Sequence, residues 1–315
     1  MFKVSKFAAL AALASLLAAC SAGGNSSLTP ATSLQPELTQ PETQMRMIDV
    51  FHGISDEGKT VLVMPTRDAL LQSGTRQAMA TSNLNYGGGP IVTSPKIYLV
   101  YWGTSWNSST GDPKAAKGLL SSFLGHVGGS PWNGVTTQYT QSGGAHVGNP
   151  GGNFGGSYVD TSSKPASRPS DASISNEANK AAAHFGVSGA NVSIVVALPH
   201  GVVPSGFKTQ YCAWHSWNGT VAYTNLPYLP DAGAGCGQGS VNSPGTLDGY
   251  SIVEGHEQAE TETDPEPSTG WTDSSGAENG DKCAWINMSN QSLNGVSFPM
   301  QPTWSNAISG CAMHL

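Results

Sequence analysis

Two short apolar segments constrain the fold of this chain more than any other feature of its sequence. The segments "KIYLVYWG" at residues 96–103 and "VSIVVALPHG" at 192–201 are rich in β-branched and aromatic residues, and glycine or proline ends each one. Such runs are typical of strands buried at the centre of a sheet. Helical patterns at about 112–126 and 175–185 lie between them. We therefore predict an α/β (α+β) fold, a single domain with a central sheet.

The first residues of the chain indicate export. Two lysines precede an apolar run over residues 7–19, which is too short to span a bilayer and predicts a signal peptide over residues 1–19. The segment that ends in Cys20 reads "LAAC" and resembles the bacterial lipobox. The resemblance implies that Cys20 carries a lipid that anchors the protein to a membrane, and Ser21 follows it as in lipoproteins sorted to the outer membrane. An ordinary secretory signal with an incidental cysteine is the alternative.

The composition fits an exported protein rather than one that binds nucleic acid. Only 11% of the residues are charged, against about 25% in an average soluble protein. The net charge of −7, without a cluster of Lys and Arg, predicts no nucleic-acid partner. A stretch rich in Ser, Thr, Pro and Gln follows Cys20, so we predict a lipidated tether and lead-in over residues 20–90 and the folded domain over 91–315. The predicted location is the outer membrane or the cell surface.

Four cysteines remain after Cys20, and they fall into two sequential pairs. An even number of cysteines in an oxidising compartment predicts two disulfides. Three pairings are open, and we favour the sequential one, Cys212–Cys236 and Cys283–Cys311. A structural zinc site formed by the four cysteines is the alternative, although the usual C-x-x-C spacing is missing. We expect the disulfides to pin a C-terminal part that is otherwise rich in loops.

The segment "GHEQAETETDP" at residues 255–265 carries the clearest chemical motif. We predict a helix from about 247 to 263, which the following Asp-Pro pair ends. His256 and Glu260 lie four residues apart, so both side chains leave one face of that helix and can bind one ion. Glu257 takes the place of the general base in His-Glu-x-x-His zinc peptidases, where this carboxylate removes a proton from the metal-bound water.

A catalytic zinc needs a third protein ligand and one open position. The acidic segment "GAENGDKC" offers two candidates, Glu278 as first choice and Asp281 as second. A disulfide at Cys283 would hold this loop still. The imidazole favours Zn²⁺, whereas the many carboxylates leave Ca²⁺ as the alternative, because Ca²⁺ takes six to eight oxygen ligands. A solvated acidic helix without any ion is a third possibility.

Several blocks of the sequence together resemble the exordium family, also called phosphate-induced protein 1, which is best known from plant cell walls. The order of the blocks is kept, although Tyr101-Trp102 reverses the family's aromatic order. The resemblance implies secretion and association with cell walls, and it implies no particular activity, since some members lose the His-Glu pair. The blocks are "KIYLVYWG" at 96–103, "QYCAWHSW" at 210–217, "LDGYSIVEGHEQAETETDP" at 247–265, "GWTDSSGAENGDKCAW" at 270–285 and "FPMQPTWSNAISGCA" at 298–312.

Two functions from different classes are consistent with these residues. The first is a zinc-dependent hydrolase, most of all a peptidase, in which Glu257 acts as the base and the fold is zincin-like by analogy. The second is a non-catalytic envelope protein that binds cell-wall glycan or a partner, with a structural metal or none. His200 and His215 are predicted to be structural. The side chains proposed to stack on glycan are Trp102, Trp106, Trp132, Trp214 and Trp217.

Overall fold

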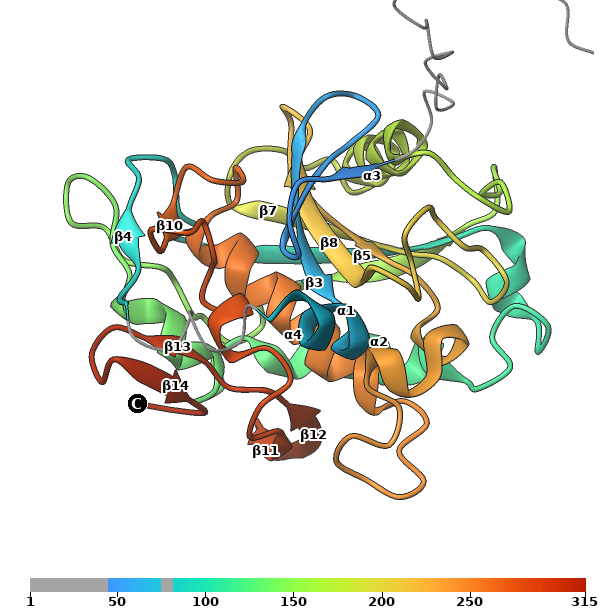
Figure 1. The fold of residues 1–315 in the computed structure, drawn as a ribbon. Helices are drawn as coiled ribbons and strands as arrows, with labels where there is room; N and C mark the ends of the chain where they lie inside the picture. Colours follow the sequence, from blue (N-terminus) through green and yellow to red (C-terminus); the bar gives the residue numbers. More distant parts are fainter. Residues whose placement is uncertain (1–44, 75–81) are drawn as a thin grey trace, which may run out of the picture. The chain divides into compact units, whose positions relative to one another are not determined.

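The computed structural model describes residues 45–74 and 82–315. Its centre is an eight-stranded sheet in the order β1-β2-β3-β8-β9-β7-β5-β6 (Figure 1). The predicted α/β fold with a central sheet is therefore confirmed. The strands of this sheet are β1 (Arg46–Met47), β2 (His52–Ile54), β3 (Thr60–Pro65), β5 (Lys96–Trp102), β6 (Phe154–Asp160), β7 (Val192–Ala197), β8 (Tyr211–Trp217) and β9 (Ala222–Leu226).

The sheet has a parallel half and an antiparallel half. The pairs β6–β5, β5–β7 and β7–β9 are parallel, whereas β9–β8, β8–β3, β3–β2 and β2–β1 are antiparallel. Parallel neighbours need a long crossover connection. The chain supplies α2 (Ala116–Val127) between β5 and β6 and α3 (Asp171–Phe185) between β6 and β7. The two apolar segments that predicted strands are β5 and β7, which pair with each other at the middle of the parallel half.

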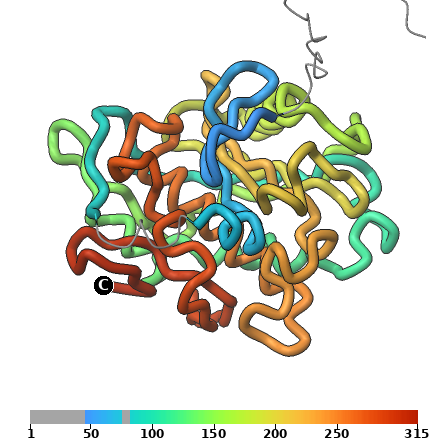
Figure 2. The backbone as a smooth tube through the Cα atoms, in the orientation of Figure 1, coloured from blue at the N-terminus to red at the C-terminus, as the bar shows by residue number. Residues whose placement is uncertain are grey.

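Helices cover both faces of the sheet. α3 packs against β5 and β7 on one face, and α4 (Asp248–Thr263) packs against β8, β3 and β9 on the other (Figure 1, Figure 2). α2 contacts α4. The carboxylate of Asp112 accepts hydrogen bonds from the backbone N–H groups of Ala116 and Lys117, at the start of α2. α1 (Arg67–Ser73) is short and begins after Thr66, whose hydroxyl accepts from Ala69 N. α4 is thus enclosed between the sheet and the rest of the chain.

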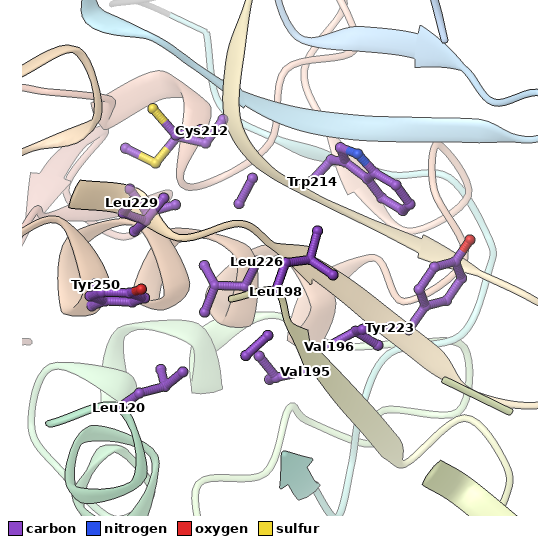
Figure 3. Close-up of a cluster of buried hydrophobic side chains, with 14 of the residues drawn as sticks. Leu120, Val195, Val196, Leu198, Cys212, Trp214, Tyr223, Leu226, Leu229 and Tyr250 are labelled. Atoms are coloured by element: carbon purple, nitrogen blue, oxygen red, sulfur yellow. The ribbon is translucent and has the colours of Figure 1, made fainter. Parts of the chain in front are cut away.

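The apolar core lies on both faces of the sheet, against α4 on one side and α3 on the other (Figure 3). Val195 and Val196 are neighbours on β7 and point to opposite faces, yet neither has measurable exposure. Both faces of this strand are therefore covered, which explains why its sequence is continuously apolar rather than alternating. Leu226 of β9, Trp214 of β8 and Tyr250 of α4 are buried in the same cluster. Burial of an aliphatic side chain such as Val195 or Leu226 contributes roughly 1.5–3 kcal/mol.

The C-terminal part is built of short elements held by disulfides. Cys212–Cys236 and Cys283–Cys311 are bonded, so the predicted pairing is confirmed and the four-cysteine zinc site is wrong. The remaining strands pair in two-stranded sheets, and they are β4 (Asn85–Tyr86) with β10 (Trp271–Thr272), β11 (Ser289–Leu293) with β12 (Val296–Met300), and β13 (Thr303–Ser305) with β14 (Gly310–Ala312). Short 3₁₀ helices connect the elements at η2 (Thr104–Asn107), η3 (Asn133–Gln138), η4 (Leu229–Cys236) and η5 (Asp281–Cys283).

Two sequence-based predictions about the sheet are wrong. The sequence predicts loop over residues 206–249, but this segment contains β8 and β9. The polar residues within these strands, such as His215 and Asn225, are buried and interrupt the apolar pattern by which a strand is recognised. The sequence predicts a lead-in up to residue 90, but β1, β2 and β3 belong to the sheet and to the same compact unit as the rest. The folded domain therefore begins before residue 91 and includes β1, β2 and β3.

The predictions about export concern residues outside those that the structure describes. The signal peptide over residues 1–19, the lipidation of Cys20 and most of the tether fall there. Within 45–74 and 82–315, none of the helices combines the length and the apolar character that crossing a bilayer requires.

Candidate metal centre

α4 is buried along its whole length, although it carries several acidic side chains. Every residue from Asp248 to Thr263 is buried. Carboxylates are almost never fully buried in proteins unless they are paired. The prediction of a solvated acidic helix is therefore wrong, and each acid on α4 needs a partner of its own.

Two acids of this region are satisfied by ordinary hydrogen bonds. Glu262 accepts from Asn133 Nδ2 at 3.0 Å and Thr136 Oγ1 at 2.7 Å. Asp264, just after α4, accepts hydrogen bonds from backbone N–H groups of the adjoining turn, including Ser268 N and Gly270 N, both at 2.7 Å. These two carboxylates hold local structure together and need no metal ion as a partner.

Glu254 is buried without a hydrogen-bond partner and belongs to neither candidate group of metal ligands. Glu257 and Glu260 converge with acids of the following loop and with two histidines in a cluster that we call the buried centre. None of these side chains exposes more than 2% of its surface. Two groups of them can hold a metal ion, because one ligand atom from each member lies within 4.8 Å of the others. One group is His256, Glu260 and Asp281, and the other is His215, Glu257 and Glu260. The buried centre consists of these five residues together with Glu278.

The first group fits the geometry of a zinc site. His256 Nε2 lies 2.9 Å from Glu260 Oε1 and 3.5 Å from Asp281 Oδ1. In a tetrahedral site with bonds of about 2.1 Å, two ligand atoms lie about 3.4 Å apart. Nε2 and the Asp281 oxygen lie at ion-pair distances, but neither atom forms a hydrogen bond of good geometry. The spacing thus suits a shared cation.

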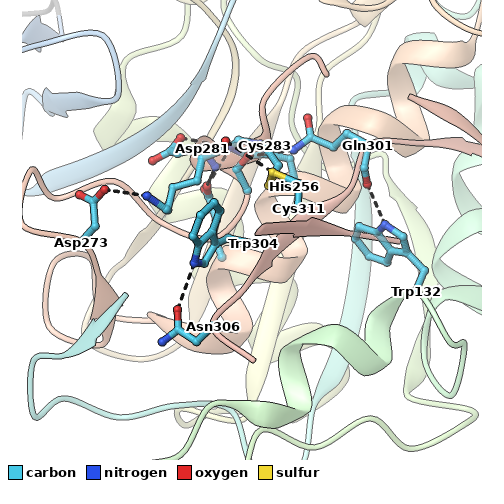
Figure 4. Close-up of a disulfide and its surroundings, with 12 residues drawn as sticks. Trp132, His256, Asp273, Asp281, Cys283, Gln301, Trp304, Asn306 and Cys311 are labelled. Atoms are coloured by element: carbon cyan, nitrogen blue, oxygen red, sulfur yellow. Dashed lines mark hydrogen bonds and ion pairs between the residues drawn. A yellow bond between two sulfur atoms is a disulfide. The ribbon is translucent and has the colours of Figure 1, made fainter. Parts of the chain in front are cut away.

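The loop that carries Asp281 is fixed against α4. Asn279 Nδ2 donates to Ala259 O at 2.9 Å, and Asp281 N donates to Glu260 Oε1 at 2.9 Å. Gly280 lies so close to the centre that a Cβ there would sit 2.8 Å from both His256 Nδ1 and Glu260 Oε1. The Cys283–Cys311 disulfide lies directly after this loop, and Figure 4 shows it beside His256 and Asp281. The sequence-based expectation of a pinned acidic loop is met.

A glutamine orients the His256 ring. Gln301 Nε2 lies 3.1 Å from His256 Nδ1 and donates to Gly280 O at 3.0 Å (Figure 4). A histidine that binds a metal through Nε2 donates its Nδ1–H, so metal binding would require the Gln301 amide to turn its oxygen Oε1, which has no hydrogen-bond partner, toward Nδ1. With Nδ1 held in this way, Nε2 faces Glu260 and Asp281. Nothing in the sequence near residue 301 indicates this role.

His215 is the residue of the buried centre that sequence reasoning missed. The sequence predicts a structural histidine, but β8 places it opposite α4, where Nδ1 lies 3.0 Å from Glu257 Oε2 and 3.7 Å from Glu260 Oε2. Its Nε2 lies 3.7 Å from Glu278 Oε2. A histidine inside the strand "YCAWHSW" is the one signal that the sequence offers, and it has meaning only once that segment is recognised as a buried strand.

Both oxygens of Glu257 already have partners. Oε1 accepts from Met64 N at 3.2 Å, and Oε2 contacts His215 Nδ1. The register between β3 and β8 shifts between Met64 and Pro65, and the Met64 N–H points to Glu257 at this shift. The candidate general base is therefore held between a strand and a histidine rather than facing an open cleft.

The electrostatics of the buried centre are those of crowded carboxylates. Burial, with repulsion from Glu260, raises the pKa of Asp281 to about 7. Burial, with repulsion from Glu260, Asp264 and Asp281, raises the pKa of Glu278 well above 4.5. Burial lowers the pKa of His256, but the carboxylates of Glu260 and Asp281 outweigh it and bring the pKa well above 6.5. A cation at the centre would relieve this repulsion.

The structure brings three of the four predicted metal ligands together and places the fourth elsewhere in the buried centre. His256 and Glu260 come together with Asp281, the second choice for the third ligand. Glu278, the first choice, lies beside His215 instead. Its two oxygens have no hydrogen-bond partner although the side chain is fully buried.

Four of the five tryptophans proposed for glycan stacking are buried. Trp106, Trp132 and Trp214 expose at most 2% of their area, and Trp102 exposes 6%. The indole N–H groups of Trp106 and Trp132 donate to backbone carbonyls of Ala197 and Gln301. These four side chains pack inside the protein, whereas Trp217 at the end of β8 is only partly buried, so the glycan-stacking hypothesis loses four of its five residues.

No protein-family model, no curated protein and no solved structure matches this chain. The resemblance to the exordium family therefore stays a prediction from the sequence blocks. The residues of the buried centre themselves are the basis on which function can be inferred.

Proposed function

We propose that this chain is an exported envelope protein whose fold is held together by a zinc ion in the buried centre. One observation carries the proposal: His256 Nε2 and Asp281 Oδ1, which lie 3.5 Å apart, are buried without hydrogen-bond partners beside Glu260 Oε1. Each buried polar atom left in this way costs about 1–3 kcal/mol. An ion bound by these side chains would remove that cost and tie α4 to the loop before Cys283.

Zinc suits this set of donors better than calcium does. His256 offers a nitrogen, and imidazole with carboxylate is a usual zinc ligand set. Calcium is normally surrounded by six to eight oxygens. The lipid anchor expected at Cys20 and the resemblance to a secreted family support an envelope location for such a protein.

The closed surroundings favour a structural ion. Structural zinc sites are closed, whereas catalytic sites keep one position open for water or substrate. None of the side chains of the buried centre exposes more than 2%, and both oxygens of Glu257 are engaged. When bound, the ion would neutralise carboxylates and cross-link segments that are distant in sequence, which stabilises the folded state alone.

One observation favours a zinc-dependent peptidase as the second candidate. His256, Glu260 and Asp281 supply three protein ligands, and Glu257 stands next to His256 on the same helix. A catalytic zinc lowers the pKa of a bound water and polarises a carbonyl. In this candidate Glu257 would accept the proton from water and His215 would position the Glu257 carboxylate. A peptide would reach these groups only after the surrounding segments moved apart.

The Glu257→Gln variant separates the two candidates. We expect it to fold and to keep the ion held by His256, Glu260 and Asp281, because the amide oxygen can still accept from Met64 N. For a structural centre, neither the wild-type protein nor the variant cleaves a panel of peptides and casein. Glu262→Gln is the matched control, since it is the same change on the same helix outside the buried centre. Wild-type turnover that falls about 100-fold or more in Glu257→Gln alone would replace the structural account by the hydrolase.

A further inference from the structure

The buried centre carries more negative charge than one divalent ion can balance. Four carboxylates belong to it, those of Glu257, Glu260, Glu278 and Asp281. With neutral imidazoles as ligands, one Zn²⁺ would leave two negative charges in a region without access to water, where unbalanced charge is costly. Two divalent ions balance four carboxylates. Protonation of two carboxyl groups is the competing way to reach neutrality.

The two oxygens of Glu260 face different histidines. Oε1 lies 2.9 Å from His256 Nε2, whereas Oε2 lies 3.7 Å from His215 Nδ1. A carboxylate placed in this way can bind one ion through each oxygen, which is how carboxylates bridge the paired metals of two-metal sites, about 3.5–4 Å apart. Glu260 is the one residue shared by both groups of metal-ligating side chains found among the described residues.

The second group has the spacing of a metal site in its own right. His215 Nδ1 lies 3.0 Å from Glu257 Oε2 and 3.7 Å from Glu260 Oε2, which brackets the separation of about 3.4 Å expected for tetrahedral zinc ligands. These three side chains have no measurable exposure.

Glu260 Oε2, which lies 3.7 Å from His215 Nδ1, is buried without a hydrogen-bond partner and points independently to a missing ligand in the second group. His215 Nε2 and both carboxylate oxygens of Glu278 are buried without a hydrogen-bond partner, and Nε2 lies 3.7 Å from Glu278 Oε2. A protonated Glu278 would need an acceptor for its O–H, and no such contact is present among the described residues. With an ion on Nδ1, Nε2 carries the proton of the imidazole and faces the Glu278 carboxylate, as the second ring nitrogen of a histidine ligand commonly does.

We propose that the buried centre binds two divalent cations, the second one held by His215, Glu257 and Glu260, with Glu260 as the bridge. The inference rests on the proposed function, because the first ion is the one assigned there to His256, Glu260 and Asp281. It assigns Glu257 to the second ion as a ligand, which accounts for its position against β8 rather than in a cleft. The pair of ions joins α4, β8 and the loop before Cys283 at one point.

Native mass spectrometry of the full chain, loaded with zinc ions and then dialysed, counts the bound ions. We expect two zinc ions per chain for the wild-type protein and one for His215→Gln. His200→Gln is the control, because His200 is half-exposed and pairs with Asp231 outside the buried centre; it should keep both ions. If His215→Gln does not fold, the number of zinc ions bound to the wild-type protein still tests the proposal, because two ions are expected and one ion would contradict it.

The possible counts separate this inference from the proposed function. One ion per chain, lost in His256→Ala and kept in His215→Gln, overturns the second site and leaves the single structural ion in place. Two ions that both survive in His215→Gln also overturn the second site as assigned. If the wild-type protein retains no zinc after dialysis, both proposals are wrong.

Discussion

Replacement of Glu260 by glutamine should empty the buried centre of metal. Glu260 belongs to both groups of candidate ligands, and its two oxygens face His256 and His215. Glutamine has nearly the same shape but only one acceptor oxygen and no charge. Loss of an outer-sphere partner already weakens metal binding about 10- to 100-fold, and loss of a shared ligand should exceed that. Metal content measured by inductively coupled plasma mass spectrometry should fall from at least one ion per chain to a trace.

The Glu260→Gln result is meaningful only beside a matched variant. Glu262→Gln changes the same residue type on the same buried helix, but Glu262 hydrogen-bonds to Asn133, Thr136 and Gln258 instead. We expect Glu262→Gln to keep its metal even if the loss of these bonds lowers its stability. Equal metal contents in Glu260→Gln and the wild-type protein would contradict the assignment of the centre.

Removal of the metal should lower the thermal stability by a large amount. An ion present at about 1,000 times its dissociation constant stabilises the folded state by about 4 kcal/mol, which corresponds to a fall in Tm of about 10 °C on its removal from a domain of this size. The repulsion among Glu260, Glu278 and Asp281, which raises the pKa of Glu278 and Asp281 in addition to burial, then acts without a cation to oppose it. Differential scanning calorimetry before and after dialysis against a chelator measures the change.

Two controls make the chelation experiment specific. Addition of zinc after dialysis should restore the original Tm, because both disulfides stay intact during the treatment. The Glu260→Gln variant should show the low Tm from the start and no response to the chelator. An unchanged Tm in the wild-type protein after verified removal of metal would show that no ion holds the fold together.

Some parts of the fold could be predicted because their signal is local. β5 and β7 are apolar on both faces, so their sequences read as buried strands without knowledge of their neighbours. α4 begins and ends within a residue of its predicted bounds, since the Asp-Pro pair after it stops a helix. The sequential disulfide pairing could be predicted from the order of the cysteines alone.

Other parts could not be predicted because their reason lies in tertiary contacts. β8 is buried with a histidine in it, and this residue is acceptable there only because Glu257 of α4 lies opposite. β1 and β2 are two and three residues long and carry almost no periodic pattern. The choice between Glu278 and Asp281 depended on the path of a short loop, which backbone contacts such as Asp281 N to Glu260 fix.

The burial of α4 is the feature that changed the functional interpretation most. The sequence of α4 suits both a surface helix and the floor of an active-site cleft, because acidic residues prefer solvent. In the structure the sheet, α2 and β12 enclose α4, and Glu254, Glu257 and Glu260 have no exposed surface. Local patterns do not report such enclosure, so a structural centre could not be preferred over a catalytic one from the sequence.

The metal content of the wild-type protein, purified without added metal, tests the central claim most directly. Inductively coupled plasma mass spectrometry should find at least one zinc ion per chain, bound through the buried centre of His256, Glu260 and Asp281. A protein that contains no transition metal, and still binds none after incubation with zinc ions, would contradict the account and leave a metal-free network of buried histidines and protonated carboxyl groups in its place.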